Sequence, residues 1–377
     1  MNAKENYQTI LNNIFGTKAP KITIDDEVNN VTEALNNLGY QKFKENFIAR
    51  LNRLKTKFEY SSTYKELLDT IKEIEGKNWT GAYAELAAYD SLQTDLLSHP
   101  IQLNVTLDNK ISFAKEMNCK KTNIDGYIGE YRLYFDVKRL SDNTKEILDK
   151  IINEVKTQSG KKCIILPEYP LDANYENYQK EWGALKLELT RELKNGIKFI
   201  KSTVIPELSY RISWGAGVTS VTSTYSPYRH AENMYRQVLI YTKKFIKKRS
   251  FFLVFVNFPW YNQAVVNGWN YNKIYYRAVA RRIFCQYQHI TTPMKQILSE
   301  FQGNETVYDV TKKITGIIFI DDNCISSEIP SSQNTTSYIF LNPNADNKPS
   351  YTARSYIYSI AGKNKESEID DFDGDNY

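Results

Sequence analysis

Hydrophobic side chains recur every three to four residues through the first 75 residues, which is the spacing typical of amphipathic helices. The clearest stripe falls within 40–60 and holds Phe43, Phe47, Leu51 and Leu54. Two further helices are expected at 25–38 and 62–74, with glycines at 39 and 76 marking their ends. Residues 1–75 are therefore predicted to form an N-terminal helical region.

After this region the pattern alternates between helical spacing and short apolar runs. Helical spacing is present in 79–97, 144–156, 182–193, 232–248 and 271–287. Continuous apolar runs at Phe251–Phe258 and Ile314–Ile320 predict strands that are covered on both faces. Shorter strands are expected twice within 101–113, and at 163–167, 210–225 and 338–341. The alternation predicts a mixed α/β (α+β) fold.

The stretch 123–140, NIDGYIGEYRLYFDVKRL, has the pattern of a β-hairpin. A two-residue turn at Gly129-Glu130 would join a strand at 124–128 to a strand at 131–140. In that register Asp125 lies opposite Tyr134 and one diagonal step from Asp136. Because side chains two apart on a strand share a face, Asp125, Asp136 and Lys138 are expected to point the same way.

Two carboxylates on one face of an apolar hairpin repel each other, and their burial is costly unless a positive charge compensates them. A divalent cation between them would remove the conflict. Mg²⁺ is suited to such a site because it takes one or two carboxylates and keeps its other positions for water or phosphate oxygens.

Glu85 adds a fourth charged side chain to this group. It shares the apolar stripe of the helix expected at 79–97 with Tyr89, Leu92 and Leu96. Glutamate is rarely buried without a partner, so a helix packed by this stripe would bring Glu85 toward the carboxylates.

The order Glu85, Asp125, Asp136-Val137-Lys138 resembles the PD-(D/E)XK nuclease superfamily, which has the restriction-endonuclease-like fold. Ile124 replaces the proline that names the motif. The resemblance covers roughly 75–170 and extends to 226–260. It implies a core of order αβββαβ, with a mixed central sheet flanked by helices.

The resemblance also implies the roles of these residues. Asp125, Asp136 and the Val137 carbonyl would bind Mg²⁺, with Mn²⁺ as a substitute, and Glu85 would help directly or through water. Lys138 would position or activate the attacking water. An alternative left open by the residues alone is an ordinary solvated face carrying a surface ion pair.

Gln237 and Tyr241 look like the Gln-xxx-Tyr element of the exonuclease branch of the superfamily, and Gly81-xxx-Glu85 resembles that branch's first motif. However, 98 residues lie between Lys138 and Gln237. Either residues 139–230 are a large insertion, or the match is chance and the two side chains only pack.

Basic side chains near this element are candidates for binding DNA. They are Lys243, Lys244, Lys247, Lys248, Arg277, Arg281 and Arg282. Aromatic residues interleaved with them in 259–282 could stack on bases, although packing in a core is the preferred interpretation for the aromatics.

Charge distribution agrees with a polyanionic ligand. The net charge is +5, and residues 364–377 hold six acids and one lysine, so the remaining 363 residues carry +10. The tail is expected to be acidic and disordered.

The four cysteines form neither a disulfide framework nor a zinc site, and neither a signal peptide nor a membrane span is expected. A cytoplasmic location follows.

These observations predict three parts: the helical region 1–75, a nuclease domain at 76–363 with an insertion at about 168–225, and the tail 364–377. The expected function is a Mg²⁺-dependent deoxyribonuclease, a restriction or anti-phage defence enzyme. A homodimer and a defence-system partner protein are left open. The alternatives are an RNA- or structure-specific nuclease and a nucleic-acid-binding partner protein with a degenerate nuclease fold. Asp321 and Asp322 at a strand end are expected in a turn rather than in a second metal site.

Overall fold

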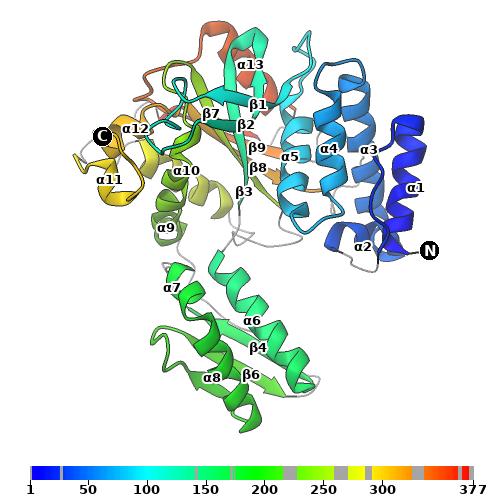
Figure 1. Cartoon of the computed structure of the whole chain (residues 1–377), viewed down its shortest axis with the longest axis vertical. Coiled ribbons are helices and arrows are strands. Elements are labelled where there is room, and N and C mark those ends of the chain that lie inside the picture. Colours follow the sequence, from blue (N-terminus) through cyan, green and yellow to red (C-terminus); the bar gives the residue numbers. More distant parts are fainter. Residues whose placement is uncertain are drawn as a thin grey trace. The chain divides into compact units, whose positions relative to one another are not determined.

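The chain folds into two compact units, which are described one at a time (Figure 1). Unit 1 comprises Met1–Leu140, Arg236–Val265 and Val279–Tyr377, and unit 2 comprises Ser141–Tyr235 and Val266–Ala278. The computed structural model describes residues 2–25, 29–140, 143–169, 173, 175–214, 227–258, 271–284, 291–324, 335–363 and 367–372.

The N-terminal helices of unit 1 confirm the helical pattern. They are α1 (Ala3–Phe15), α2 (Asn30–Asn36), α3 (Gln41–Phe58), α4 (Tyr64–Glu73) and α5 (Trp79–Leu92). Asn2 and Asn29 cap the first two through capping boxes, which satisfy backbone N–H groups that the helices leave free. These helices share one hydrophobic core with the central sheet, so the region 1–75 packs as part of unit 1.

Helix α5 differs from the amphipathic helix expected at 79–97. It ends at Leu92, and eleven of its fourteen residues are buried. Leu96, expected on its apolar stripe, lies beyond the helix and is exposed. A helix buried on nearly all sides is the centre of a domain rather than its covering layer. In Figure 1, α5 lies between α4 and the strands of the sheet.

A mixed sheet of seven strands forms the centre of unit 1, with helices flanking it. Its strands are β1 (Gln102–Asp108), β2 (Lys121–Ile128), β3 (Leu133–Arg139), β7 (Ser250–Asn257), β8 (Gly316–Asp322), β9 (Thr335–Leu341) and β10 (Glu368–Asp370), which neighbour one another in that order. β1, β2 and β3 form an antiparallel meander, and β3, β7 and β8 run parallel. The expectation that β7 is covered on both faces is confirmed by seven buried residues out of eight.

The two faces of this sheet contact different residues. Leu133, Phe135 and Val137 of β3 point into the core formed with α5 and with α13 (Tyr351–Ala361). Because side chains alternate along a strand, Asp136 and Lys138 point to the opposite face.

Several sequence predictions need correction. Only one strand, β1, forms within 101–113 among the described residues. Asp321 and Asp322 are the buried end of β8, paired with β9, and are not in a turn. Part of the expected disordered tail is ordered, since β10 pairs with β9 and Phe372 is buried. Residues 364–366 and 373–377 lie outside the described residues.

Unit 2 has its own core and its own sheet. It contains α6 (Asn143–Ser159), β4 (Cys163–Glu168), α7 (Tyr175–Lys180), α8 (Trp182–Lys194), β5 (Phe199–Lys201) and β6 (Ser209–Trp214). Strand β4 pairs with β6 and not with the central sheet, so the α6–β4 pair does not complete the αβββαβ order. The unit begins at residue 141, well before the expected insertion boundary at 168.

The chain returns to the central sheet through α9 (Pro227–Ile240), the 3-10 turn η4 (Thr242–Lys244) and β7. The helix therefore begins and ends earlier in the chain than the range 232–248 expected from the pattern. The remaining helices are α10 (Tyr271–Phe284), α11 (Met294–Ile297) and α12 (Val307–Thr311). Tyr275 and Tyr276 of α10 are buried, which confirms the packing interpretation for these two aromatics.

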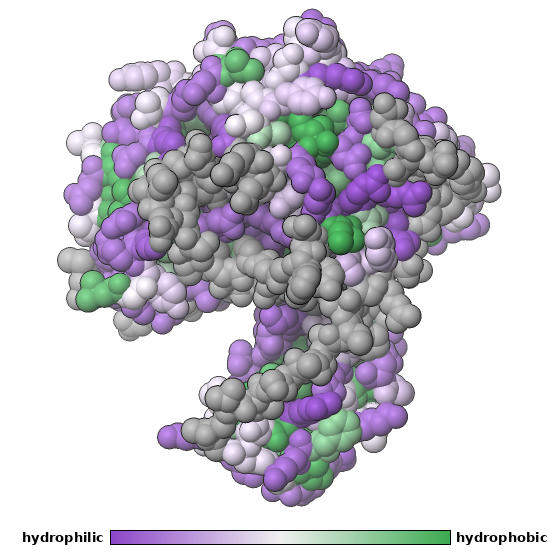
Figure 2. Space-filling view, turned by 180° about the vertical axis from the view of Figure 1, so that it is seen from behind, coloured by the Kyte–Doolittle hydropathy of each residue, from purple (hydrophilic) through white to green (hydrophobic). Residues whose placement is uncertain are grey.

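The surface in Figure 2 is largely hydrophilic, with hydrophobic residues in small separate patches. In the part of the chain that the structure describes, every helix is too short or too polar to cross a membrane.

Candidate active site

The turn between β2 and β3 is longer than expected. Gly126, Tyr127 and Ile128 pair with Phe135, Tyr134 and Leu133, so four residues connect the strands instead of two. The connection is a 3-10 turn, Gly129–Tyr131, followed by Arg132 in the left-handed conformation at φ 53°. The register therefore moves by two positions, and two is the side-chain period of a strand, so every side chain keeps its face.

The corrected register brings the two carboxylates closer than the diagonal arrangement expected from sequence. Continuing the observed pairing by one step places Asp125 across from Asp136. The backbone ladder ends at Gly126, and the Asp125 carboxylate instead accepts the Val137 N–H at 2.5 Å. Asp125 is therefore held in place by the backbone of the strand that carries Asp136 and Lys138.

Asp136 is fully buried and forms ion pairs with two lysines. Its Oδ2 lies 2.5 Å from the Nζ of Lys138, and its Oδ1 lies 2.6 Å from the Nζ of Lys244 in η4. The sequence offered Lys244 only as a DNA-binding candidate, and its position one turn past Tyr241 is the signal that could have linked it to the site.

The electrostatics of the site follow from this burial. Desolvation, then the negative charges of Asp136 and Glu85, raise the pKa of Asp125 well above its ordinary value. Burial alone would lower the pKa of Lys138, but the carboxylates of Asp136 and Asp125 outweigh it and raise that pKa. Lys138 is therefore a cation at neutral pH, and the surroundings of Asp125 make that carboxyl group harder to ionise.

Glu85 joins the site through hydrogen bonds and charge. It accepts hydrogen bonds from the hydroxyls of Tyr89 at 3.1 Å and Thr70 at 3.5 Å, while the Tyr89 hydroxyl also lies 3.3 Å from the Asp125 carbonyl. Burial raises the pKa of Glu85, and the charges of Lys138 and Asp136 also act on it. The helix thus brings Glu85 into the electrostatic environment of the hairpin, as expected.

Three oxygen-bearing groups converge on one point in the structure, and that point is the ammonium group of Lys138. Its Nζ lies 2.5 Å from Asp136 Oδ2, 2.8 Å from the Val137 carbonyl oxygen and 4.0 Å from Asp125 Oδ2. The centroid of the Tyr241 ring lies 4.9 Å from the same nitrogen.

The oxygen atoms around the Lys138 ammonium group are possible ligands for a metal ion. Among the described residues, no three histidine, cysteine, aspartate or glutamate side chains come close enough together to hold a metal. Two carboxylates and a backbone carbonyl do converge, and these hard oxygen donors suit Mg²⁺, which needs few protein ligands. The ammonium group stands where a cation would be bound, so Asp125, Asp136 and Val137 fit the group, and Glu85 lies outside the direct set.

The accessory residues and the predicted DNA-binding residues differ in burial and in contacts. Gln237 is half-buried on α9, and Tyr241 contacts Lys138 through its ring. Lys247 is paired with Glu116 at 2.7 Å and lies over the Phe113 ring. The remaining candidates are the exposed Lys243, Lys248 and Arg281, and the half-buried Arg277 and Arg282.

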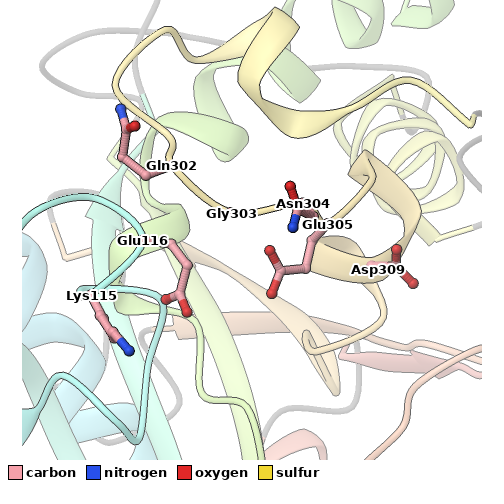
Figure 3. A pocket seen from close by; sticks show the side chains of 7 residues that line it. All are labelled: Lys115, Glu116, Gln302, Gly303, Asn304, Glu305 and Asp309. Carbon is pink, nitrogen blue, oxygen red and sulfur yellow. The ribbon is translucent and has the colours of Figure 1, made fainter.

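A separate cavity of about 580 Å³ lies between the segment after β1 and the loop before α12 (Figure 3). Its lining consists of Lys115, Glu116, Gln302, Gly303, Asn304, Glu305 and Asp309. Glu305 extends toward Glu116 from the other side of the cavity. None of the hairpin residues lines it, so this cavity is distinct from the carboxylate site.

A buried charge network that the sequence did not indicate lies on the opposite face of the sheet. Arg50 Nη2 contacts Asp322 Oδ1 at 2.6 Å, and both side chains are at most 1% exposed. The Tyr83 hydroxyl donates to the same carboxylate, and Asp90 pairs with Arg50 and Arg53. It connects α3, α5 and β8 and has no described contact with Asp136, which indicates a structural role.

No protein-family model matches the chain, and neither a curated protein nor a solved structure matches it.

Proposed function

We propose that the protein is a Mg²⁺-dependent deoxyribonuclease with a restriction-endonuclease-like core. The observation that carries the proposal is the convergence of Asp125, Asp136 and the Val137 carbonyl on the Lys138 ammonium group. Carboxylates and a lysine joined in this way are the parts that metal-assisted phosphodiester hydrolysis requires.

The order of the elements supports the same proposal. α5, β1, β2, β3, α9 and β7 follow one another in the αβββαβ order, with residues 141–235 inserted between β3 and the end of α9. This insertion accounts for the 98 residues between Lys138 and Gln237. The contact of the Tyr241 ring with the Lys138 ammonium group supports Tyr241 as part of an accessory motif of the site.

The residues of the chain would act as follows. Asp125, Asp136 and the Val137 carbonyl hold Mg²⁺, and when bound the ion supplies positive charge at the scissile phosphate. Lys138 is protonated, so it attracts the phosphate and stabilises the negative charge that builds up during hydrolysis. Lys138 could accept a proton from water only after it had released its own proton, and its ion pair with Asp136 opposes that release. Lys244 contributes a second positive charge to the same site.

The test is cleavage of supercoiled plasmid by wild type, Asp136→Asn and Lys138→Met, each with Mg²⁺ and with EDTA. Asp95→Asn is the control, because Asp95 is 98% exposed and its described ion pair is with Lys57 at the surface. We expect wild type to cleave the plasmid with Mg²⁺ and not with EDTA. Cleavage activity should fall at least about 100-fold in both site variants and stay unchanged in the control. Cleavage in EDTA, or an active Asp136→Asn, would contradict the proposal. Inactivity of wild type on both DNA and RNA would leave the degenerate-fold alternative.

A further inference from the structure

Only one face of the three-stranded sheet of unit 2 packs against the hydrophobic core of that unit. Ile200, Tyr210 and Ile212 point into the core that α6 and α8 complete. The next residues along each strand point the other way, because side chains alternate. This second face, called the open face, carries Ile164, Leu166, Glu168, Phe199, Lys201, Ser209, Arg211 and Ser213.

The open face exposes apolar groups that a core would normally cover. The Phe199 side chain is 55% exposed and Ile164 is 40% exposed. Across the strands, Leu166 and Phe199 both pair with Arg211, so Arg211 lies between an aromatic and an aliphatic residue in one row of the open face. Paired side chains of neighbouring strands lie about 5 Å apart, so this row is continuous.

The charges on and around this face are predominantly positive. Lys201 and Arg211 lie on it, and Lys162 and Lys198 are exposed directly before β4 and β5. Since β4 and β5 both run antiparallel to β6, these two lysines lie at the same end of the sheet.

Among the described residues of the open face itself, Glu168 is the acid that opposes Lys201 and Arg211. Glu168 pairs with Arg211 at 2.6 Å, with side-chain exposures of 30% and 58%, and it also accepts a hydrogen bond from Ser209. An ion pair this exposed contributes little, so a phosphate group can compete with Glu168 for Arg211.

We propose that the open face of unit 2 binds single-stranded DNA. Exposed aromatic rings next to basic side chains bind single strands because the rings stack on bases while the cations neutralise phosphates. A duplex would not use Phe199 in this way, since its bases are already stacked on one another. The choice of DNA over RNA rests on the proposed function, but the binding surface itself does not depend on cleavage.

The experiment measures the affinity of the full-length protein for a labelled 20-nucleotide oligothymidine by fluorescence anisotropy, in EDTA so that cleavage cannot occur. We expect Phe199→Ala to weaken binding about tenfold, as removal of one stacking platform does. Leu187→Ala is the matched control, because Leu187 is 74% exposed on α8 of the same unit and is expected to leave affinity unchanged.

Two further variants separate stacking from folding and from general hydrophobic contact. Phe199→Tyr keeps an aromatic ring and should retain affinity, whereas Phe199→Leu keeps apolar area without the ring and should lose it. Lys201→Ala should lower the slope of log affinity against log salt by about 0.7, the value for one phosphate contact on a single strand. Circular dichroism and the thermal midpoint establish that each variant is folded.

Several results would overturn the proposal: equal effects of Phe199→Ala and Leu187→Ala, retained affinity in Phe199→Leu, or tighter binding of oligouridine than of oligothymidine. A dimer that Phe199→Ala dissociates without loss of DNA affinity would assign the face to a second copy of the chain. Plasmid cleavage by Phe199→Ala with normal oligothymidine binding would refute this inference alone. Phe199-dependent binding by a protein that never cleaves would refute the proposed function alone.

Discussion

The Nζ of Lys244 lies 2.6 Å from Oδ1 of Asp136, although the two residues are 108 positions apart in the chain. Lys138 contacts the other oxygen of the same carboxylate. Each oxygen of the buried aspartate is therefore compensated by its own ammonium group. Any metal ion that binds Asp136 has to compete with two positive charges.

Lys244→Met is expected to strengthen Mg²⁺ binding. Removing one ammonium group from contact with Asp136 removes one of the two positive charges with which the ion competes, and a unit charge at this distance in a partly buried site is worth more than 1 kcal/mol. We expect the Mg²⁺ concentration for half-maximal binding, measured by isothermal titration calorimetry, to fall about tenfold.

The control for this prediction is Lys243→Met, which removes the same charge from an exposed position one residue earlier. It should change Mg²⁺ affinity by less than about twofold, because exposed charges are screened by water and salt. Equal effects of the two variants would mean that net charge, and not contact with Asp136, decides metal affinity.

Asp125→Asn is expected to stabilise the metal-free protein, and increasingly so as the pH rises. Burial and the neighbouring carboxylates raise the folded-state pKa of Asp125, so the folded state holds its proton more tightly than the unfolded state. The wild-type free energy of unfolding therefore falls as the pH rises from the unfolded pKa, about 3.9, through the higher folded pKa. Asparagine has no such loss and can still accept the Val137 N–H.

The measurement is urea unfolding of both proteins in EDTA at a series of pH values. The stability of Asp125→Asn minus that of wild type should be near constant below pH about 4, rise above it and level off once Asp125 is ionised in the folded state. A difference that stays constant across the series would show that Asp125 titrates normally. Adding Mg²⁺ at high pH should stabilise wild type more than the variant.

Local patterns predicted correctly which side chains of the hairpin share a face, because strand alternation has a short period. The expected turn was wrong by two residues, yet Asp125, Asp136 and Lys138 still share a face since a shift of two leaves strand alternation intact. The helix carrying Glu85 was also found, although it is buried nearly all round and not amphipathic.

Long-range pairing is what the sequence could not supply. The runs at 163–167 and 251–258 both predict buried strands, and nothing local determines that β4 joins the small sheet while β7 pairs with β3. The contact between Lys244 and Asp136 depends on that choice. The same limit applies to Arg50 and Asp322, which are 272 positions apart.

Asp322→Ala is expected to destabilise the protein by about 3–5 kcal/mol, because it leaves the buried Arg50 guanidinium without its principal partner. The Arg50–Asp322 distance is 2.6 Å and both side chains are almost fully buried, so water cannot replace the lost carboxylate. Urea unfolding at pH 7 measures the change.

Lys57→Ala is the comparison for a surface pair. Its partner Asp95 is 98% exposed, and the loss should be under about 1 kcal/mol. A similarly small loss in Asp322→Ala would show that the remaining contacts of Arg50, with Asp90 at 3.4 Å and with the Tyr83 hydroxyl, are sufficient to compensate its charge.

Gly126→Ala tests whether the packing beside Asp125 positions the site. A Cβ atom at residue 126 would lie 2.1 Å from the Phe135 ring, which packs edge-on against Tyr89. The ring has to move toward Tyr89, the residue that donates to Glu85, so both stability and the site are disturbed. We expect a loss of about 1–3 kcal/mol in stability, as overpacking of a core produces, together with reduced plasmid cleavage.

Gly81→Ala is the control, because its Cβ meets nothing within 4 Å and alanine favours the helix by up to about 1 kcal/mol. If Gly126→Ala unfolds and cleaves like wild type, the contact between Phe135 and Gly126 does not position the carboxylates.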